Sequence, residues 1–417
     1  MKILFNSKMF NKFLNTISNM GPGALIAAAF IGPGTVTICS ISGTNFGYTL
    51  LWVIFLSLII VMILQEMSVR IGIISQKSLT ELIKTELDNS FLKKLLIVLI
   101  FIAIIIGNTA YEAGNISGAI LGFEAIIGTF SYNLNNININ LISPFIGLLG
   151  FIILYKGSYK LLEKTLIFFV FLMSLSFIIS AIITKPELNN IINGIIQLRA
   201  PNNSFLTILS LIGTTVVPYN IFLHSSLVKE KWKKKTDLTI AKIDLFIAVI
   251  LGGIVSISII ITGANVSLLN ISNAADLALG LEPLYGPASK YFMGIGLIAA
   301  GITSSITAPL AASFVACGCF GWKSDFKSRK FKFIWITILI IGTIISSTGI
   351  DLIIIIEFAQ ITNALLLPII VIVLYYIMNN NKVFGSYTNS VYQNFIGFLI
   401  IVITIFLSIK TILTLFN

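Results

Sequence analysis

The sequence predicts an all-α polytopic membrane protein of eleven transmembrane helices, built as two halves of five helices plus one extra helix. Composition is the first reason: 57% of the 417 residues are hydrophobic, 10% are charged, and the mean hydropathy is +1.00. Soluble domains do not have this composition. The second reason is that apolar stretches of spanning length recur along the chain. The third is that two of them are interrupted at matching places.

The apolar stretches define the expected organisation. They run over 22–46, 50–70, 95–127, 139–155, 165–184, 206–228, 240–262, 289–316, 333–349, 352–377 and 392–415. We expect one transmembrane domain over 1–417, with a first repeat at about 20–184, a second at about 206–377 and the extra helix at about 392–415.

The basic residues predict the orientation. Most Lys and Arg fall in the N-terminal tail, in the even-numbered loops or at the adjoining span ends, and the exceptions are Lys185, Arg199, Lys290 and Lys410. This asymmetry predicts a plasma (inner) membrane protein with a cytoplasmic N-terminus and the C-terminus outside. No cleaved signal peptide is expected, because the basic start runs directly into the first span. The net charge of +11 therefore reflects topology, and no nucleic-acid partner is predicted.

The three cysteines, Cys39, Cys317 and Cys319, fall in or beside spans, so no disulfide framework is expected. Cys317-x-Cys319 lacks a nearby His or Cys partner, so no resident metal is predicted there. The sequence also lacks a nucleophile–base pairing and a phosphate-binding loop. An enzyme is therefore not predicted.

The first span contains "FIGPGTVTIC", residues 30–39, in which Gly32, Pro33 and Gly34 interrupt the helix. Broken backbone at membrane depth is tolerated only where it is buried in protein or lines a cavity.

The sixth span contains "IGTTVVPYNIFLHS", residues 212–225, interrupted at Pro218 and Asn220. One discontinuous helix at the start of each five-helix half is the plan of inverted-repeat secondary transporters. The alternative is that both prolines only kink packed helices.

Five motifs stand out in the spans: "GPGALIAAAFIGPGT" in the first, "QEMSVRIGIISQKSLTELI" at the end of the second, "VVPYNIFLHSSLV" in the sixth, "GITSSITAPLA" in the eighth and "QITNALLLP" in the tenth. These motifs resemble those of the Nramp family of proton-coupled divalent-metal transporters. The resemblance covers most of the chain. It implies a LeuT-like inverted repeat (5+5) with discontinuous helices 1 and 6.

The chain departs from this family at the metal ligands. Where metal-transporting members carry an Asp, an Asn and a Met, this sequence has Gly32, Thr35 and Val217, and Tyr219 replaces a histidine. A divalent cation without a carboxylate would face a large desolvation cost. The departure predicts that manganese, iron and magnesium are not transported unless another acid reaches the site.

The uncharged break instead favours an anion. A new half-helix starts after Gly34, and its free N–H groups and dipole favour negative charge. The expected pocket suits a small oxyanion such as bicarbonate, although Thr35 and Thr37 could bond only to their own helix. The predicted substrate-binding residues are Gly32, Pro33, Gly34, Thr35, Thr37, Thr214, Val217, Tyr219, Asn220 and Gln360.

Glu112 is the predicted ion-coupling acid, because intramembrane acids are functional by default. Asn108, Glu112 and Asn115 share one helix face, while Gly114, Gly118 and Gly122 form a packing face. By resemblance, Asn115 replaces an acid of the family's proton pathway and Glu112 occupies the position of a second. Alternatively, Glu112 is bonded to Asn108 or to a neighbouring helix.

Two further groups are candidates for coupling. Resemblance to LeuT-like folds implies a bound sodium ion at Thr303, Ser304 and Ser305, although such hydroxyls can also only join helices. His224 could titrate near neutral pH, or it could be a satisfied packing residue.

The favoured function is therefore a secondary transporter of a small inorganic anion, with bicarbonate first and sodium or proton coupling. One alternative is a divalent metal ion (manganese, iron or magnesium) with a relocated site. Others are a small organic carboxylate or amino acid, and a channel or non-transporting sensor. The expected partners are the lipid bilayer and the small inorganic ion.

Overall fold

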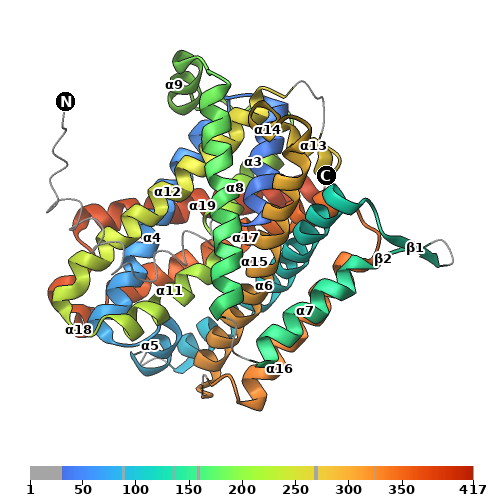
Figure 1. Cartoon of the computed structure of the whole chain (residues 1–417). Helices are drawn as coiled ribbons and strands as arrows, with labels where there is room; N and C mark the ends of the chain where they lie inside the picture. The colour runs from blue at the N-terminus through green and yellow to red at the C-terminus, as the bar shows by residue number, and fades with distance from the viewer. Residues whose placement is uncertain are drawn as a thin grey trace, which may run out of the picture.

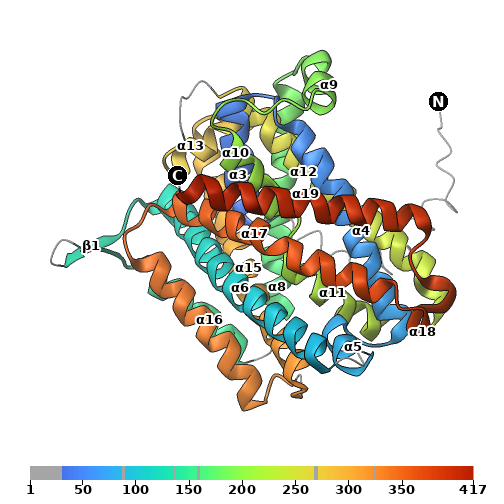
Figure 2. The same cartoon turned by 180° about the vertical axis from the view of Figure 1, so that it is seen from behind.

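The computed structural model describes residues 31–86, 90–134, 137–156, 160–266, 271–323 and 325–416. Within these residues the chain is a bundle of long helices, crossed on one side by the last helix (Figures 1 and 2). The predicted helical membrane fold is confirmed.

Each predicted span corresponds to a helix or a broken pair. The bounds are α3 (Pro33–Phe46), α4 (Leu51–Ser75), α6 (Ser90–Ile127), α7 (Ile142–Lys156), α8 (Lys160–Ile183), α10 (Phe205–Thr215) with α11 (Pro218–Lys231), α12 (Leu238–Ala264), α15 (Ser289–Phe320), α16 (Arg329–Ser347), α17 (Leu352–Met378) and α19 (Val391–Phe416). Residues 22–30 of the first predicted span lie outside the described residues.

Not every helix is long enough to cross a membrane alone. In the described ranges, eight helices are long and apolar enough to cross a membrane, with α10 and α11 counted as one span. A ninth span results if α8 is joined to α9 (Leu188–Ile196), from which it is separated by a sharp bend. The remaining two predicted spans, α3 and α7, have 14 and 15 residues. Because α3 starts at a break, its short length is expected of half of a discontinuous helix.

Short elements connect the spans. They are α5 (Leu79–Glu86), the 3-10 helix η1 (Lys235–Asp237), α13 (Ala274–Ala278), η2 (Leu279–Leu281), α14 (Glu282–Tyr285), η3 (Gly286–Ala288), α18 (Asn381–Phe384) and η4 (Gly385–Tyr387). An antiparallel hairpin of β1 (Ser131–Leu134) and β2 (Ile137–Asn140) pairs Ser131 with Asn140. The hairpin corrects the fourth predicted span, which begins at Ile142 because residues 139 and 140 belong to β2.

The predicted small-residue face of α6 packs against three different helices. A side-chain carbon added to Gly114 would meet Ala359 of α17, and one on Gly118 would overlap Pro33 of α3. On Gly122 it would meet the Gly294 carbonyl of α15 at 2.6 Å. Since glycine lets backbones approach closely, this face brings α6 against the break in the first span.

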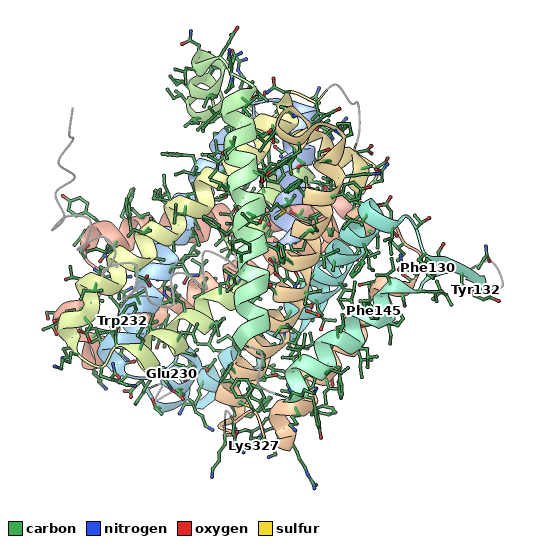
Figure 3. All side chains as sticks on the ribbon, in the orientation of Figure 1. Phe130, Tyr132, Phe145, Glu230, Trp232 and Lys327 are labelled. Carbon is green, nitrogen blue, oxygen red and sulfur yellow. The ribbon has the colours of Figure 1, made fainter. Side chains whose placement is uncertain are left out.

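The connecting helices mark the two ends of the bundle. In Figure 1, α9, α13 and α14 gather at the top, and α5 and α18 lie at the bottom. Figure 3 labels Glu230, Trp232 and Lys327 toward the lower end and Phe130, Tyr132 and Phe145 on the hairpin side. Which end faces the cytoplasm remains the charge-based prediction.

Candidate ion-binding site at the helix breaks

The first break lies at the start of α3. Gly32 is the N-cap in an extended conformation (φ −83°, ψ 173°), no side chain caps the helix, and Pro33 is its first residue. Proline suits this position because its missing N–H would have had no helical partner. The backbone at the start of α3 is buried in the protein, and no side chain caps it.

The second break separates α10 from α11. Helix α10 ends at Thr215, and α11 begins at Pro218 with Val217 as an extended N-cap. Val216 and Val217 are fully buried although they lie outside helical structure. The predicted discontinuity of the sixth span is confirmed.

The two breaks are in contact. The hydroxyl oxygens of Thr35 and Thr214 lie 2.9 Å apart in a buried hydrogen bond between α3 and α10. Gln360 of α17 joins both broken spans. Its side-chain amide occupies the space beside Gly34, and its backbone carbonyl oxygen lies against Gly213.

Two further side chains reach the first break. A carbon added to Gly32 would lie 3.5 Å from the Ser304 hydroxyl of α15 and 3.6 Å from the Tyr111 hydroxyl of α6. The ring of Tyr111 in turn meets that of Tyr219 edge to face, with centroids 5.5 Å apart. The break is thus surrounded by hydroxyl and amide groups from five helices.

Several polar atoms near the breaks have no hydrogen-bond partner. They are both amide atoms of Asn220, the Gln360 Oε1 atom and the Thr37 hydroxyl, and all three residues are buried. Buried polar groups are normally paired, so unpaired ones indicate a place for water or a ligand. Thr37 does not bond to its own helix, which was the alternative for that residue.

None of the ten predicted binding residues carries a carboxylate. The ten predicted binding residues are neutral, and in the described part of the chain no group of three or more His, Cys, Asp or Glu could hold a metal ion. The available ligands are hydroxyl, amide and backbone oxygens, together with amide and hydroxyl donors. Such a set can contact a hard cation through oxygens or an anion through donors.

Glu112 is fully buried on α6, and its carboxyl group interacts with the side chain of Asn115 on the same helix. Its Cγ atom would lie 2.6 Å from a side-chain carbon added to Gly342 of α16, so Glu112 faces α16. The proposed bond to Asn108 is absent from the structure, since that amide donates to the Ile104 carbonyl instead.

The three residues of the predicted sodium site do not face the same way. Thr303 and Ser305 donate to the Ala299 and Ile302 carbonyls of their own helix, at 2.7 and 3.0 Å. Ser304 alone is placed toward the first break. The structure therefore brings one of the three hydroxyls to the first break.

His224 is buried between α11 and α4. Its Nδ1 atom lies 2.7 Å from Gln65 Oε1, while its Nε2 atom has no partner. Sequence analysis missed Gln65 and Tyr111. Gln65 could have been noticed as a polar residue within an apolar run, whereas nothing in the sequence places Tyr111 beside Gly32.

The comparison with known families decides the family. The profile described as natural resistance-associated macrophage protein-like (Nramp) matches residues 23–414. The chain belongs to this family. The resemblance seen in the motifs is confirmed over nearly the whole sequence.

Two relatives are similar to this chain over nearly their full length. The divalent metal cation transporter MntH of Bacillus subtilis is 26% identical, and the alignment covers 97% of this chain and 94% of the relative. MntH of Staphylococcus aureus is 28% identical, and the alignment covers 100% of this chain and 95% of the relative. The fold matches the crystal structure of an Eremococcus coleocola manganese transporter mutant, with a TM-score of 0.74, 19% identity, and coverage of 96% and 87%.

These similarities bear on the expected substrate. The names of the relatives match the divalent-metal alternative better than the anion that the sequence favoured, and nothing in the comparisons supports bicarbonate. The coarser expectation, a multi-pass secondary transporter of the Nramp family, is confirmed.

Proposed function

We propose that this Nramp protein transports a divalent metal cation that binds between the breaks of α3 and α10–α11. The observation that carries this proposal is full-length similarity to proteins named divalent metal cation transporters. The proposal also includes residence in the plasma membrane with a cytoplasmic N-terminus, which rests on the distribution of Lys and Arg.

The cation would be bound by neutral oxygens. Thr35, Thr214, Asn220 and Gln360 offer hydroxyl and amide oxygens around the breaks. Without a carboxylate, the ion must keep part of its hydration shell, as Mg²⁺ commonly does in proteins. We therefore expect weak binding and a preference for hard cations, since Val217 supplies no sulfur.

Glu112 is the proposed coupling residue. It is a fully buried acid, it adjoins Tyr111 in sequence, and Tyr111 reaches the first break. An acid in such a place can exchange a cation or proton while the substrate occupies the break. Ser304 and His224 remain secondary candidates, Ser304 because it faces Gly32 and His224 because one ring nitrogen is unpaired.

A small inorganic anion such as bicarbonate is the second candidate. Helices α3 and α11 both begin at the breaks, each with a proline as its first residue and no capping side chain. Helix N-termini attract anions, and no carboxylate at Gly32 would repel one.

Transport by the purified chain in proteoliposomes tests both candidates. Mn²⁺ influx is followed with a trapped metal-sensitive dye, and bicarbonate influx with a trapped pH dye or with labelled bicarbonate. We expect saturable Mn²⁺ influx that Mg²⁺ inhibits and no bicarbonate influx above protein-free vesicles. Bicarbonate influx without Mn²⁺ influx would replace the first candidate with the second.

A further inference from the structure

A pocket of about 340 Å³ lies between α9 and the turn that leads from α3 into α4. We call it the α9 pocket. Its lining includes Tyr48, Asn190, Asn193, Gln197 and Arg199, and none of its described lining residues belongs to the helix breaks. The volume is within the range of pockets that bind small ligands.

Helix α9 turns across the bundle at the end of a membrane span. The chain bends by 116° between α8, which ends at Ile183, and α9. In Figure 1, α9 accordingly projects from the top of α8. Because the apolar run of α8 ends at Ile183, a bilayer crossed by α8 reaches its headgroups where α9 begins. This position places α9 in the membrane interface.

Two faces of α9 differ in polarity. Leu188, Ile192 and Ile196 recur every four residues, and they are 73, 50 and 70% exposed. We call these three residues the apolar stripe. Asn193 and Gln197, which are also four residues apart, line the α9 pocket. A helix with one exposed apolar face and one polar face binds where lipid headgroups meet acyl chains.

Close contacts hold α9 and the residues after it against the start of α4. A side-chain carbon added to the buried Gly194 would overlap the Tyr48 carbonyl, so this glycine lets α9 lie directly on the turn. The Trp52 indole N–H donates to the Arg199 carbonyl at 2.9 Å. Tryptophan is enriched at membrane interfaces, which agrees with the level inferred for α9. The pocket wall is therefore anchored on both sides of Gln197.

Arg199 supplies an available positive charge. Within the described ranges, no hydrogen bond or ion pair holds its guanidinium, and no lining residue is Asp or Glu. The Glu187 carboxylate, outside the lining, accepts from the Asn190 amide at 3.2 Å. The Gln197 amide donates to Asn193 Oδ1 at 3.3 Å, and both side chains keep further N–H donors. A guanidinium beside amide donors suits a phosphate, which arginine binds through two N–H groups.

Arg199 is also one of the four basic residues that depart from the charge asymmetry of the spans. Two of the others are used within the fold, because Lys290 and Lys410 lie over the rings of Tyr291 and Phe205, at 5.1 and 4.3 Å from the ring centroids. The described part of the chain provides no such ring for Arg199. A ligand of negative charge would supply the missing partner.

We propose that the α9 pocket binds the phosphate of an anionic phospholipid. Arg199, Asn193 and Gln197 would contact the headgroup, and the acyl chains would lie along the apolar stripe. A soluble phosphate ester would use the donors but leave the stripe in water, so the stripe favours a lipid. This inference does not depend on which ion the protein transports, because lipid binding is measured without transport.

The test reads lipid contact from Trp52, which borders the pocket. The full-length protein is placed in phosphatidylcholine vesicles that contain increasing fractions of phosphatidylglycerol brominated on its acyl chains, which quenches nearby tryptophans. The chain has four tryptophans, so the Trp52 signal is the difference between each protein and the same protein with Trp52→Phe. Brominated phosphatidylcholine is the neutral-lipid arm, and dissolved glycerol phosphate is the free-phosphate arm.

Arg199→Gln removes the proposed phosphate contact, and Lys185→Gln is the matched control. Lys185 is an exposed cation at the same end of α8 that does not line the pocket. We expect brominated phosphatidylglycerol to quench wild-type Trp52 at a several-fold lower fraction than brominated phosphatidylcholine does. Arg199→Gln should raise the half-quenching fraction of phosphatidylglycerol about fivefold, and Lys185→Gln less than about twofold.

Equal quenching of wild-type Trp52 by the two brominated lipids would overturn the inference, because the apolar stripe would then meet lipid without choosing a headgroup. Equal losses in Arg199→Gln and Lys185→Gln would also overturn it, since general surface charge would explain both. Relief of quenching by millimolar glycerol phosphate would assign the pocket to a soluble phosphate ester instead. Unchanged quenching with glycerol phosphate, together with the selective loss in Arg199→Gln, supports the lipid site.

Discussion

The hydroxyl oxygens of Thr35 and Thr214 lie 2.9 Å apart, although the residues are 179 positions apart in sequence. This bond joins the first helical turn of α3 to the last turn of α10. It therefore holds the two discontinuous spans together where the substrate is proposed to bind. Because both side chains are buried, the loss of one hydroxyl cannot be compensated by bulk water.

Thr214→Val keeps the shape of the side chain but removes its hydroxyl. We expect it to lower the free energy of unfolding by about 1 kcal/mol and to raise the Michaelis constant for Mn²⁺ several-fold, because Thr35 loses this partner. Thermal unfolding in detergent and uptake in proteoliposomes measure the two effects. Thr214→Ser should restore both, and equal values for wild type and Thr214→Val would show that the bond is dispensable.

Glu112→Gln removes the buried acid at nearly constant volume. We expect Mn²⁺ accumulation driven by a sodium or proton gradient to disappear, while Mn²⁺ still equilibrates across the membrane, because the helix breaks are unchanged. Glu357→Gln, a half-buried acid on α17, is the control and should transport normally. Gradient-driven accumulation at the wild-type level in Glu112→Gln would make Glu112 structural.

The Glu81–Lys229 pair gives a pH-dependent prediction outside the spans. Burial raises the pKa of Glu81. The hydrogen bonds from Lys229 (2.6 Å) and from the Ser78 N–H (2.8 Å), together with the Lys229 charge, outweigh burial and leave the pKa below its usual 4.5. A lowered folded-state pKa stabilises the protein above 4.5, and that contribution is lost as pH falls through the lowered value.

We therefore expect the melting temperature of wild type to fall below pH 4.5 more steeply than that of Lys229→Met. The difference is read from thermal unfolding in detergent between neutral and acidic pH. Parallel melting curves for the two proteins would show that the pair adds no pH-dependent stability. Because Glu81 is partly exposed, salt should reduce the difference.

The sequence was sufficient to predict the helices because hydropathy and helix breakers are local signals. The breaks at Pro33 and Pro218 and the packing glycines of α6 were found in this way. The β1–β2 hairpin was missed. Its short strands adjoin an apolar run, and hydropathy alone merged residues 139 and 140 with the following helix.

Side-chain pairing could not be predicted in the same way, because it depends on how distant helices rotate against one another. Hydroxyls at 303–305 looked equivalent in sequence, yet only Ser304 is turned toward Gly32. Likewise, the contact of Glu112 with α16 depends on Gly342, and no motif around this glycine marks it as a contact position.

Gly32→Asp tests the central claim most directly, because it restores the acid that metal-transporting relatives are expected to carry. Gly32 has a negative φ, and an added side-chain carbon would meet its nearest neighbours at 3.5 and 3.6 Å, so the position accepts a Cβ atom without strain. Ala at the same position is the control for bulk. A carboxylate about 4 Å from a unit charge at an effective dielectric near 20 is worth on the order of 4 kcal/mol.

The measurement is Mn²⁺ binding by isothermal titration calorimetry on wild type, Gly32→Asp and Gly32→Ala. If a divalent cation occupies the break, Gly32→Asp should bind Mn²⁺ at least about a hundredfold more tightly than wild type, and Gly32→Ala should not. An unchanged or absent Mn²⁺ signal in Gly32→Asp, with bicarbonate transport by wild type that this variant abolishes, would contradict the account.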